Sequence, residues 1–304
     1  MTGTAGASAP VVFLAEQRPA AEAALLRVAQ GLAGRDPLRE AVRYALGGPG
    51  KRLRPILCVA AYRAVGGPGP DAAVHDLAVA LELVHTYSLV HDDLPCMDDD
   101  ALRRGRPAVH RVFGAHVAMV AGAALIPLAL ARVARAALAL ELAETRATRL
   151  VVELAQGAGA AGMVGGQLLD LEAEGHAPGL DEVDGIHARK TGALLAAAAR
   201  MGGVAGGAED GIVHALGRYG QALGLAFQIT DDVLDVAGDP AVLGKAAGRD
   251  SAHDKATYPA LLGLDGARVR AGKAAADAIA ALRGAGIESH ELEGLASFAA
   301  ERDR

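Results

Sequence analysis

Apolar side chains recur at helical spacing along most of the chain. Before residue 92, Leu77, Leu81 and Val84 occupy positions i, i+4 and i+7, which marks one buried face of a helix. Clusters of Gly and Pro separate such segments, and no run of useful length alternates between apolar and polar residues. The pattern predicts helices over residues 19–32, 38–46, 56–65, 71–92, 110–140, 144–171, 181–201 and 211–236, and three shorter ones within 258–300.

No linker divides these helices and no strand pattern alternates with them. We therefore expect one all-α domain over residues 19–304, preceded by a mobile segment over residues 1–18. Composition agrees with this reading. Of the 304 residues 52% are hydrophobic but only 3% are aromatic, and the abundant Ala and Leu are strong helix formers.

Charge and cysteine content narrow the possible functions. The net charge of −6, without a long basic run, argues against nucleic-acid binding. Cys58 and Cys96 are too few for a disulfide framework or a structural zinc site, and they fit a cytoplasmic protein. The longest uncharged apolar run, residues 117–131, contains Pro127 and is shorter than the ~20 residues of a membrane span. It predicts a buried helix in a soluble protein without stable membrane insertion.

Two acidic clusters interrupt the apolar pattern. The first places five carboxylates within nine residues, followed by Arg103 and Arg104: Asp92, Asp93, Asp98, Asp99 and Asp100. The second comprises Asp231, Asp232 and Asp235, which fall at about 0°, 100° and 40° around a helix and so share one face. A solvated acidic face is the commoner explanation of such a cluster. Here the flanking residues are apolar, so the carboxylates need a counter-charge.

A hard cation bound through oxygen would satisfy both clusters. Mg²⁺ is preferred where phosphates share the coordination. Neither cluster has the Gly and Glu spacing of an EF-hand calcium loop, and no His/Cys set suits zinc.

Basic residues gather in or beside the Gly- and Pro-rich segments. They are Lys51, Arg54, Arg103, Arg104, Lys190, Lys245 and Lys255. Each alone is commonly a surface charge, but together with the acidic clusters they predict a site for a diphosphate. ATP is not favoured, because the GxxxxGK[ST] loop is absent. His85 stands seven residues before Asp92, which puts both on one helix face.

Six motifs in this order resemble those of the trans-isoprenyl diphosphate synthase (polyprenyl synthetase) family. They are Gly50-Lys51-Arg52-Leu53-Arg54-Pro55, the segment 92–98 with Arg103-Arg104, Gly166-Gln167, Lys190-Thr191-Gly192, the segment 227–235, and the segment 255–259. The resemblance covers about residues 38–300 and is to the bacterial farnesyl diphosphate synthase (geranyltranstransferase) type. Two Asp motifs, each with its basic partners, make this combination highly specific.

The resemblance implies a helical bundle with a deep central cavity and a division of roles among the residues. The metal site would hold three Mg²⁺ ions with substrate bound, through Asp92, Asp98 and Asp231, supported by Asp93, Asp232 and Asp235. The allylic diphosphate would be held by Arg103, Lys190, Lys245 and Lys255. Isopentenyl diphosphate would be held by Lys51, Arg54, His85 and Arg104. The residues that assist the reaction itself would be Lys190, Thr191, Gln228 and Lys245, with Thr191 and Gln228 near the reacting carbons.

The implied reaction ionises an allylic diphosphate, adds isopentenyl diphosphate and eliminates a proton, in a homodimeric enzyme. Tyr87 and Ser88 lie about one turn, or ~6–7.5 Å, below Asp92 along the helix. In the family a bulky aromatic residue at the position of Tyr87 is associated with a fifteen-carbon product. We therefore expect farnesyl diphosphate, with geranylgeranyl diphosphate as the alternative.

Two departures from the family pattern stand out. Pro49-Gly50 separates Gly47-Gly48 from Lys51, where the family usually has Gly-Gly-Lys. Ala123 follows Gly122 where the family usually has Asp. Two other functions share part of the pattern: a class I terpene cyclase, whose second metal motif is absent here, and a non-catalytic regulatory subunit, which commonly loses part of an Asp motif.

Overall fold

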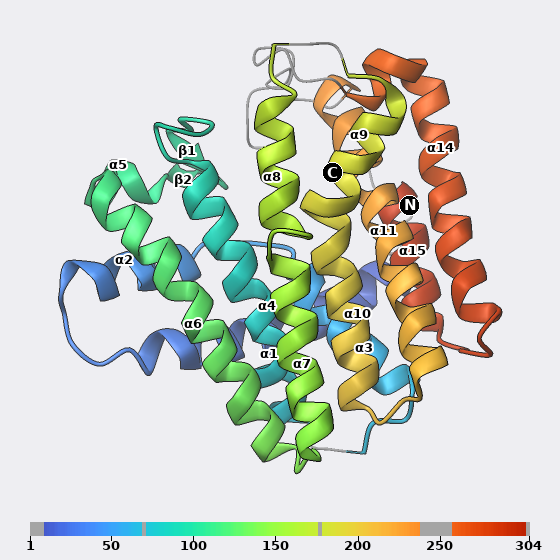
Figure 1. The fold of residues 1–304 in the computed structure, drawn as a ribbon, viewed down its shortest axis with the longest axis horizontal. Coiled ribbons are helices and arrows are strands. Elements are labelled where there is room, and N and C mark those ends of the chain that lie inside the picture. Colours follow the sequence, from blue (N-terminus) through green and yellow to red (C-terminus); the bar gives the residue numbers. More distant parts are fainter. Residues whose placement is uncertain (1–8, 69–70, 176–177, 238–256, 302–304) are drawn as a thin grey trace, which may run out of the picture.

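The computed structural model describes residues 9–68, 71–175, 178–237 and 257–301, and this part of the chain is almost entirely helical (Figure 1). Its strands are the antiparallel two-residue pair β1 (Leu102–Arg103) and β2 (Arg106–Pro107). The helices are α1 (Ala9–Gln30), α2 (Pro37–Leu46), α3 (Leu53–Ala64), α4 (Asp71–Asp92), α5 (Val109–Phe113), α6 (Ala115–Ala139), α7 (Glu144–Ala158), α8 (Met163–Glu172), α9 (Leu180–His187), the π-helix η1 (Ala188–Gly192), α10 (Ala193–Ala205), α11 (Asp210–Ala237), α14 (Tyr258–Arg283) and α15 (His290–Glu301).

The helix ends follow local signals. Asp36 caps α2 by accepting a hydrogen bond from the Arg39 amide at 3.0 Å, and Pro37 occupies the first turn. Thr257 caps α14 in the same way, through the Ala260 amide. The N-terminal boundary differs from the prediction, because α1 begins at Ala9 rather than at residue 19. Residues 9–18 of the segment expected to be mobile are therefore helical.

Two predicted long helices are divided. The one expected over 110–140 breaks at Gly114, whose φ of 82° is incompatible with a right-handed helix. The one expected over 144–171 breaks between α7 and α8, at a segment that contains Gly159 and Gly162. Hydrophobic spacing continues across both breaks, so periodicity alone did not reveal them. The three helices predicted near the C-terminus are present, because a kink at Gly263 divides α14.

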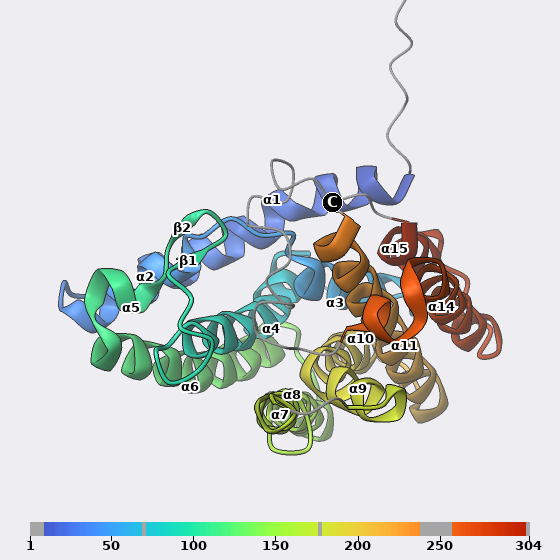
Figure 2. The same cartoon turned by 90° about the horizontal axis from the view of Figure 1, so that it is seen from above.

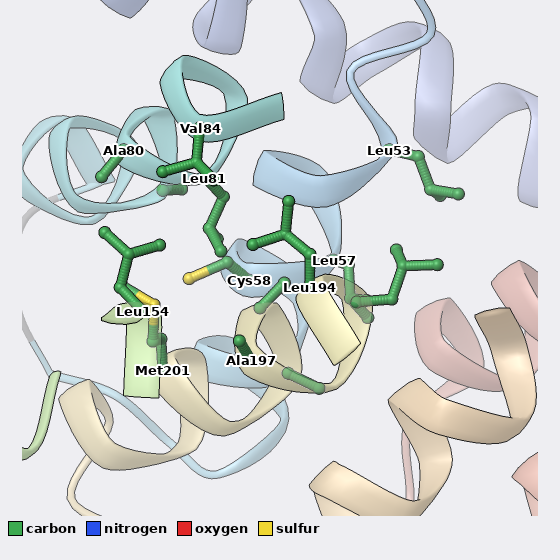
Figure 3. Packing of buried hydrophobic residues seen from close by; sticks show 14 of the residues in the cluster. Leu53, Leu57, Cys58, Ala80, Leu81, Val84, Leu154, Leu194, Ala197 and Met201 are labelled. Atoms are coloured by element: carbon green, nitrogen blue, oxygen red, sulfur yellow. The ribbon is translucent and has the colours of Figure 1, made fainter. Parts of the chain in front are cut away.

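The core lies where α3, α4, α7 and α10 meet (Figure 3). Leu57, Leu81, Leu154 and Leu194 are fully buried there, and each such burial stabilises the fold by roughly 1.5–3 kcal/mol. Small residues bring α10 close to α3: a Cβ on Gly202 would lie 2.2 Å from the Cys58 carbonyl oxygen. Around this core α4 packs along α6, while α11 packs between α10 and α14 (Figure 2).

Helix α6 differs from the buried helix that was expected. Its one buried face comprises eight residues, among them Ala118, Leu125 and Val133. On the other side Met119 and Ile126 are exposed. Among the described helices, α6 is the one long and apolar enough to cross a bilayer by length and composition. That is weak evidence, because core helices of soluble proteins pass the same test.

Candidate active site

The first acidic cluster forms a tight turn at the end of α4. The helix stops at Asp92, three residues before Pro95, and the amide of Asp98 donates to the carbonyl of Asp92 at 2.9 Å. This bond folds the chain back and brings Asp98 beside the helix end. In Figure 1 α4 rises to this turn and continues into the β1–β2 ribbon.

The carboxylates of this cluster fall into two groups. Asp93 and Asp100 are buried and paired with Arg103, whose Nε donates to Asp93 Oδ1 at 2.7 Å and whose Nη2 donates to Asp100 Oδ2 at 2.9 Å. Asp92 and Asp98 are only partly buried. The two carboxylates assigned to metal are thus the accessible pair, whereas Asp93, which was assigned to a supporting position, is buried.

The electrostatic environment of Asp92 suits a cation. Partial burial raises the pKa of Asp92 to about 6, an effect that Lys190 opposes and Asp98 reinforces. Burial also raises the pKa of Asp93, opposed by Arg103. The influence of Lys190 shows that η1 lies beside the end of α4.

The second cluster shows the same division on α11. Asp231 is exposed, whereas Asp232 and Asp235 are buried. Asp232 accepts hydrogen bonds from Gln228 Nε2 at 3.0 Å and from the Tyr258 amide at 3.1 Å. The buried carboxylate therefore connects α11 to the start of α14, while its neighbour Asp231 remains open to solvent.

Lys190 and Thr191 lie in the π-helix η1, a wide turn of a kind often found at functional sites. Thr191 donates to Gln228 Oε1 at 3.1 Å, which continues the hydrogen-bonded chain to Asp232. Lys190 Nζ is 2.5 Å from Asp170 on α8. The two helices approach closely at Gly166, where a Cβ would lie 2.2 Å from the Lys190 amide nitrogen.

Arg54 and Arg104, which are assigned to isopentenyl diphosphate, lie around His85 of α4. Arg104 Nη2 is 3.2 Å from His85 Nε2, so the imidazole accepts through that nitrogen. Burial, together with Arg54 and Arg104, holds the pKa of His85 well below its usual range, which keeps the ring neutral. Burial lowers the pKa of Arg54 to about 10, so Arg54 is still charged at neutral pH. Lys51 Nζ lies 5.8 Å from the centre of the Phe227 ring, which places the basic loop beside α11.

Three carboxylates that were not selected as site residues from the sequence form ion pairs with basic residues of the site and its loops. Asp100 pairs with Arg103, Asp170 with Lys190, and buried Glu82 with Arg52 at 2.8 Å. The pairing of Asp100 could have been predicted from the sequence, because Asp100 lies three residues before Arg103. Asp170 could have been considered because it follows the Gly166-Gln167 motif closely. Lys245 and Lys255 lie outside the described residues.

Both departures from the family pattern can be placed. Ala123 is exposed on α6, whereas the adjacent Gly122 is buried against His91 of α4. The carboxylate that the family usually carries there would therefore lie on the exposed side of this chain. Pro49 accepts a hydrogen bond from Arg104 at 2.9 Å, and Gly50 lies directly beside the same guanidinium.

Mg²⁺ fits the carboxylates that are present. Within the described ranges no three His, Cys, Asp or Glu side chains lie close enough to hold a metal by themselves. Mg²⁺ does not need such a cage, because it commonly uses one or two carboxylates together with substrate phosphates and water. The accessible Asp92, Asp98 and Asp231 are oxygen donors of that kind, and they would hold the ions against a diphosphate.

Comparisons with known proteins found a matching family, similar proteins and similar structures. A family model described as polyprenyl synthetase matches residues 35–285. The farnesyl diphosphate synthase of Geobacillus stearothermophilus is 41% identical over 297 residues, which is 96% of this chain and 97% of that protein. The large subunit 1 of the heterodimeric chloroplast geranylgeranyl pyrophosphate synthase of Arabidopsis thaliana is 45% identical over 239 residues, 77% of this chain and 64% of the plant protein. The crystal structure of a Helicobacter pylori geranyltransferase, complexed with magnesium and isoprenyl diphosphate, superposes with a TM-score of 0.81 at 30% identity and covers 97% of this chain and 98% of that one.

Proposed function

The chain belongs to the polyprenyl synthetase family of trans-prenyltransferases, and from that premise we propose that it condenses isopentenyl diphosphate with dimethylallyl and geranyl diphosphates to give farnesyl diphosphate. One observation carries the proposal. The three carboxylates assigned to metal are accessible, while the three assigned to support are buried. This is the arrangement expected of a site that takes up a metal–diphosphate complex.

The chain's own residues bind and orient the two substrates. Bound Mg²⁺ would stabilise the negative charge that develops on the departing allylic diphosphate. Lys190, held by Asp170 beside Asp92, adds a fixed positive charge at the same place. Lys51, Arg54 and Arg104 would hold isopentenyl diphosphate beside His85. Thr191 and Gln228, fixed by their mutual hydrogen bond, are assigned to the reacting carbons. Lys245 and Lys255 are assigned to the allylic diphosphate from the sequence motif.

Geranylgeranyl diphosphate is the second candidate product. The similarity to a plant geranylgeranyl pyrophosphate synthase subunit favours it. The similarity to a bacterial farnesyl diphosphate synthase over nearly the whole chain, and the aromatic Tyr87 below the first Asp motif, favour the shorter product. We give these two observations more weight, because Tyr87 belongs to the segment where the growing chain would end.

We also propose that the protein is a cytoplasmic homodimer. The support for the dimer is the exposed apolar face of α6, on which Met119, Val120 and Ile126 are 49%, 47% and 36% exposed and Leu138 is 79% exposed. Exposed apolar residues on one helix are typical of a subunit interface. The support for the cytoplasm is the low cysteine content.

The test of the proposed reaction is direct. Purified protein is incubated with Mg²⁺, isopentenyl diphosphate and, in separate reactions, dimethylallyl, geranyl or farnesyl diphosphate, and the products are identified by mass. We expect farnesyl diphosphate from the first two starters and little extension of the third. Efficient extension of farnesyl diphosphate would identify the twenty-carbon product instead. Release of diphosphate without elongation would contradict the synthase function and indicate a cyclase.

A further inference from the structure

The backbone of Arg104 adopts a conformation that is unfavourable for a residue with a side chain. Its φ is 53°, a left-handed conformation that is unfavourable for residues with a Cβ, and it precedes Gly105 in the turn between β1 and β2. Its side chain is exposed at the edge of the basic loop. An exposed, flexible side chain on such a turn needs contacts elsewhere to keep one position.

The contacts of Arg104 orient its guanidinium without neutralising it. Nη1 donates to the Pro49 carbonyl at 2.9 Å, and Nη2 donates to the neutral ring of His85 at 3.2 Å. The neighbouring arginines differ: Arg103 is paired with Asp93 and Asp100, and Arg52 with Glu82. Within the described part of the chain, Arg104 therefore combines a fixed position with a charge that an incoming anion can still use.

Gly50 supplies the space for this arrangement. A Cβ at Gly50 would lie 2.7 Å from Arg104 Nη1 and 2.9 Å from Arg52 Nη1, well inside contact distance. Both overlaps are with the ends of long side chains, so a larger residue would displace the guanidinium groups and leave the backbone in place. The buried Arg52–Glu82 pair fixes the same loop from inside.

We propose that the turn at Pro49 and Gly50 anchors Arg104 and so positions it to bind the diphosphate of isopentenyl diphosphate. The inference rests on the proposed function, which assigns Arg104 to that substrate. Residues 49 and 50 are positioning residues, because they act through Arg104. The two residues Pro49-Gly50, by which this chain differs from the usual Gly-Gly-Lys of the family, are then part of the binding site.

The test is Gly50→Ala, with Gly48→Ala as the matched control in the same loop. A Cβ at Gly48 would meet the Ala45 carbonyl oxygen at 3.6 Å and Arg106 Nη1 at 3.8 Å, which are ordinary contacts. For Gly50→Ala we expect the KM of isopentenyl diphosphate to rise about tenfold, the effect of losing one charge-assisted hydrogen bond. The KM of geranyl diphosphate should stay close to wild type, and Gly48→Ala should change neither KM by more than about twofold. The melting temperature of Gly50→Ala should fall, because the Arg52 Nη1 that the methyl displaces is the atom that donates to buried Glu82.

A double-mutant cycle distinguishes positioning from a general loss of structure. If Gly50 acts through Arg104, then Gly50→Ala adds little to the effect of Arg104→Lys. An unchanged KM for isopentenyl diphosphate, an equal rise of both KM values, or additive effects in the cycle would overturn the proposal. Calorimetric titration of wild type and Gly50→Ala with isopentenyl diphosphate measures the dissociation constant without turnover, and a weaker constant in the variant is expected if Gly50 positions Arg104. Absence of condensation in wild type would therefore refute the proposed function, while the titration would still decide the role of Gly50.

Discussion

The His91 ring stands edge-on to the Tyr87 ring one turn earlier on α4, with 4.7 Å between the ring centroids and 67° between the planes. His91 is held in turn by α6, because its Nε2 lies 2.9 Å from the Met119 carbonyl oxygen. A Cβ on Gly122 would lie 2.3 Å from His91 Cδ2, so the glycine leaves the space that the ring fills. Tyr87 is thus supported from behind by a second helix.

Tyr87→Ala is expected to lengthen the product. Removing the phenol would open the level below the first Asp motif, where we expect the fifteen-carbon chain to end. With geranyl diphosphate as starter, mass analysis should show products of twenty carbons or more in place of farnesyl diphosphate. Tyr87→Phe keeps the ring and should keep the wild-type product length. Unchanged product length in Tyr87→Ala would show that Tyr87 is not the floor of the cavity.

Gly122→Ala is expected to move His91 and weaken its support of Tyr87. The added methyl overlaps the imidazole, so we expect a loss of about 1–3 kcal/mol in the free energy of unfolding and a larger share of long products. Gly272→Ala on α14 is the control, because a Cβ there meets nothing within 4 Å and Ala favours the helix by roughly 0.5–1 kcal/mol. Urea unfolding and product analysis measure both effects. If Gly122→Ala is destabilised but makes products of wild-type length, then His91 has no part in determining product length.

Acid should weaken the fold partly through His85. The pKa of His85 is held well below its usual range, with burial as the main cause and Arg54, Arg104, Arg103 and Arg52 as further causes. As the pH falls through about 6.5, the unfolded chain takes up a proton that folded His85 refuses, so stability falls with pH. His85→Gln should make the free energy of unfolding less sensitive to pH between 7.5 and 5.5, measured at one protein concentration. The exposed His214→Gln should leave that sensitivity unchanged.

Ile126→Glu is expected to separate the subunits of the proposed dimer. The substitution places a charge within the exposed apolar face of α6, which would be desolvated in an interface. Light scattering after gel filtration should show a dimer for wild type and a monomer for the variant. Val269→Glu, at a 74% exposed position on α14, is the control and should remain dimeric. A wild-type protein that is monomeric at micromolar concentration would refute the dimer.

The helical fold and most of the site could be predicted from sequence because both leave local signals. Apolar spacing located α4 and α11, and the unusual density of carboxylates at their ends indicated where a cation would bind. The supporting contacts could not be predicted in this way. Asp170 and Lys190 are twenty residues apart, and only the packing of α8 against η1 joins them. The π-turn at Lys190 was also missed, since the spacing of apolar residues hardly changes over a single wide turn.

The neighbours Asp98 and Asp99 give the sharpest test of the metal site. Asp98 is folded back beside Asp92 and is assigned to Mg²⁺, whereas exposed Asp99 points its carboxylate toward Arg111, with 3.4 Å between Asp99 Oδ1 and Arg111 Nη2. Asp98→Ala should raise the Mg²⁺ concentration for half-maximal activity by roughly 10–100-fold, because a lost ligand weakens the site at least as much as a lost supporting contact. Asp99→Ala removes the same charge from the same turn and should shift that concentration by less than about threefold. Equal shifts in both variants would mean that the cluster attracts cations only through its net charge, and Asp98 would then not be a ligand.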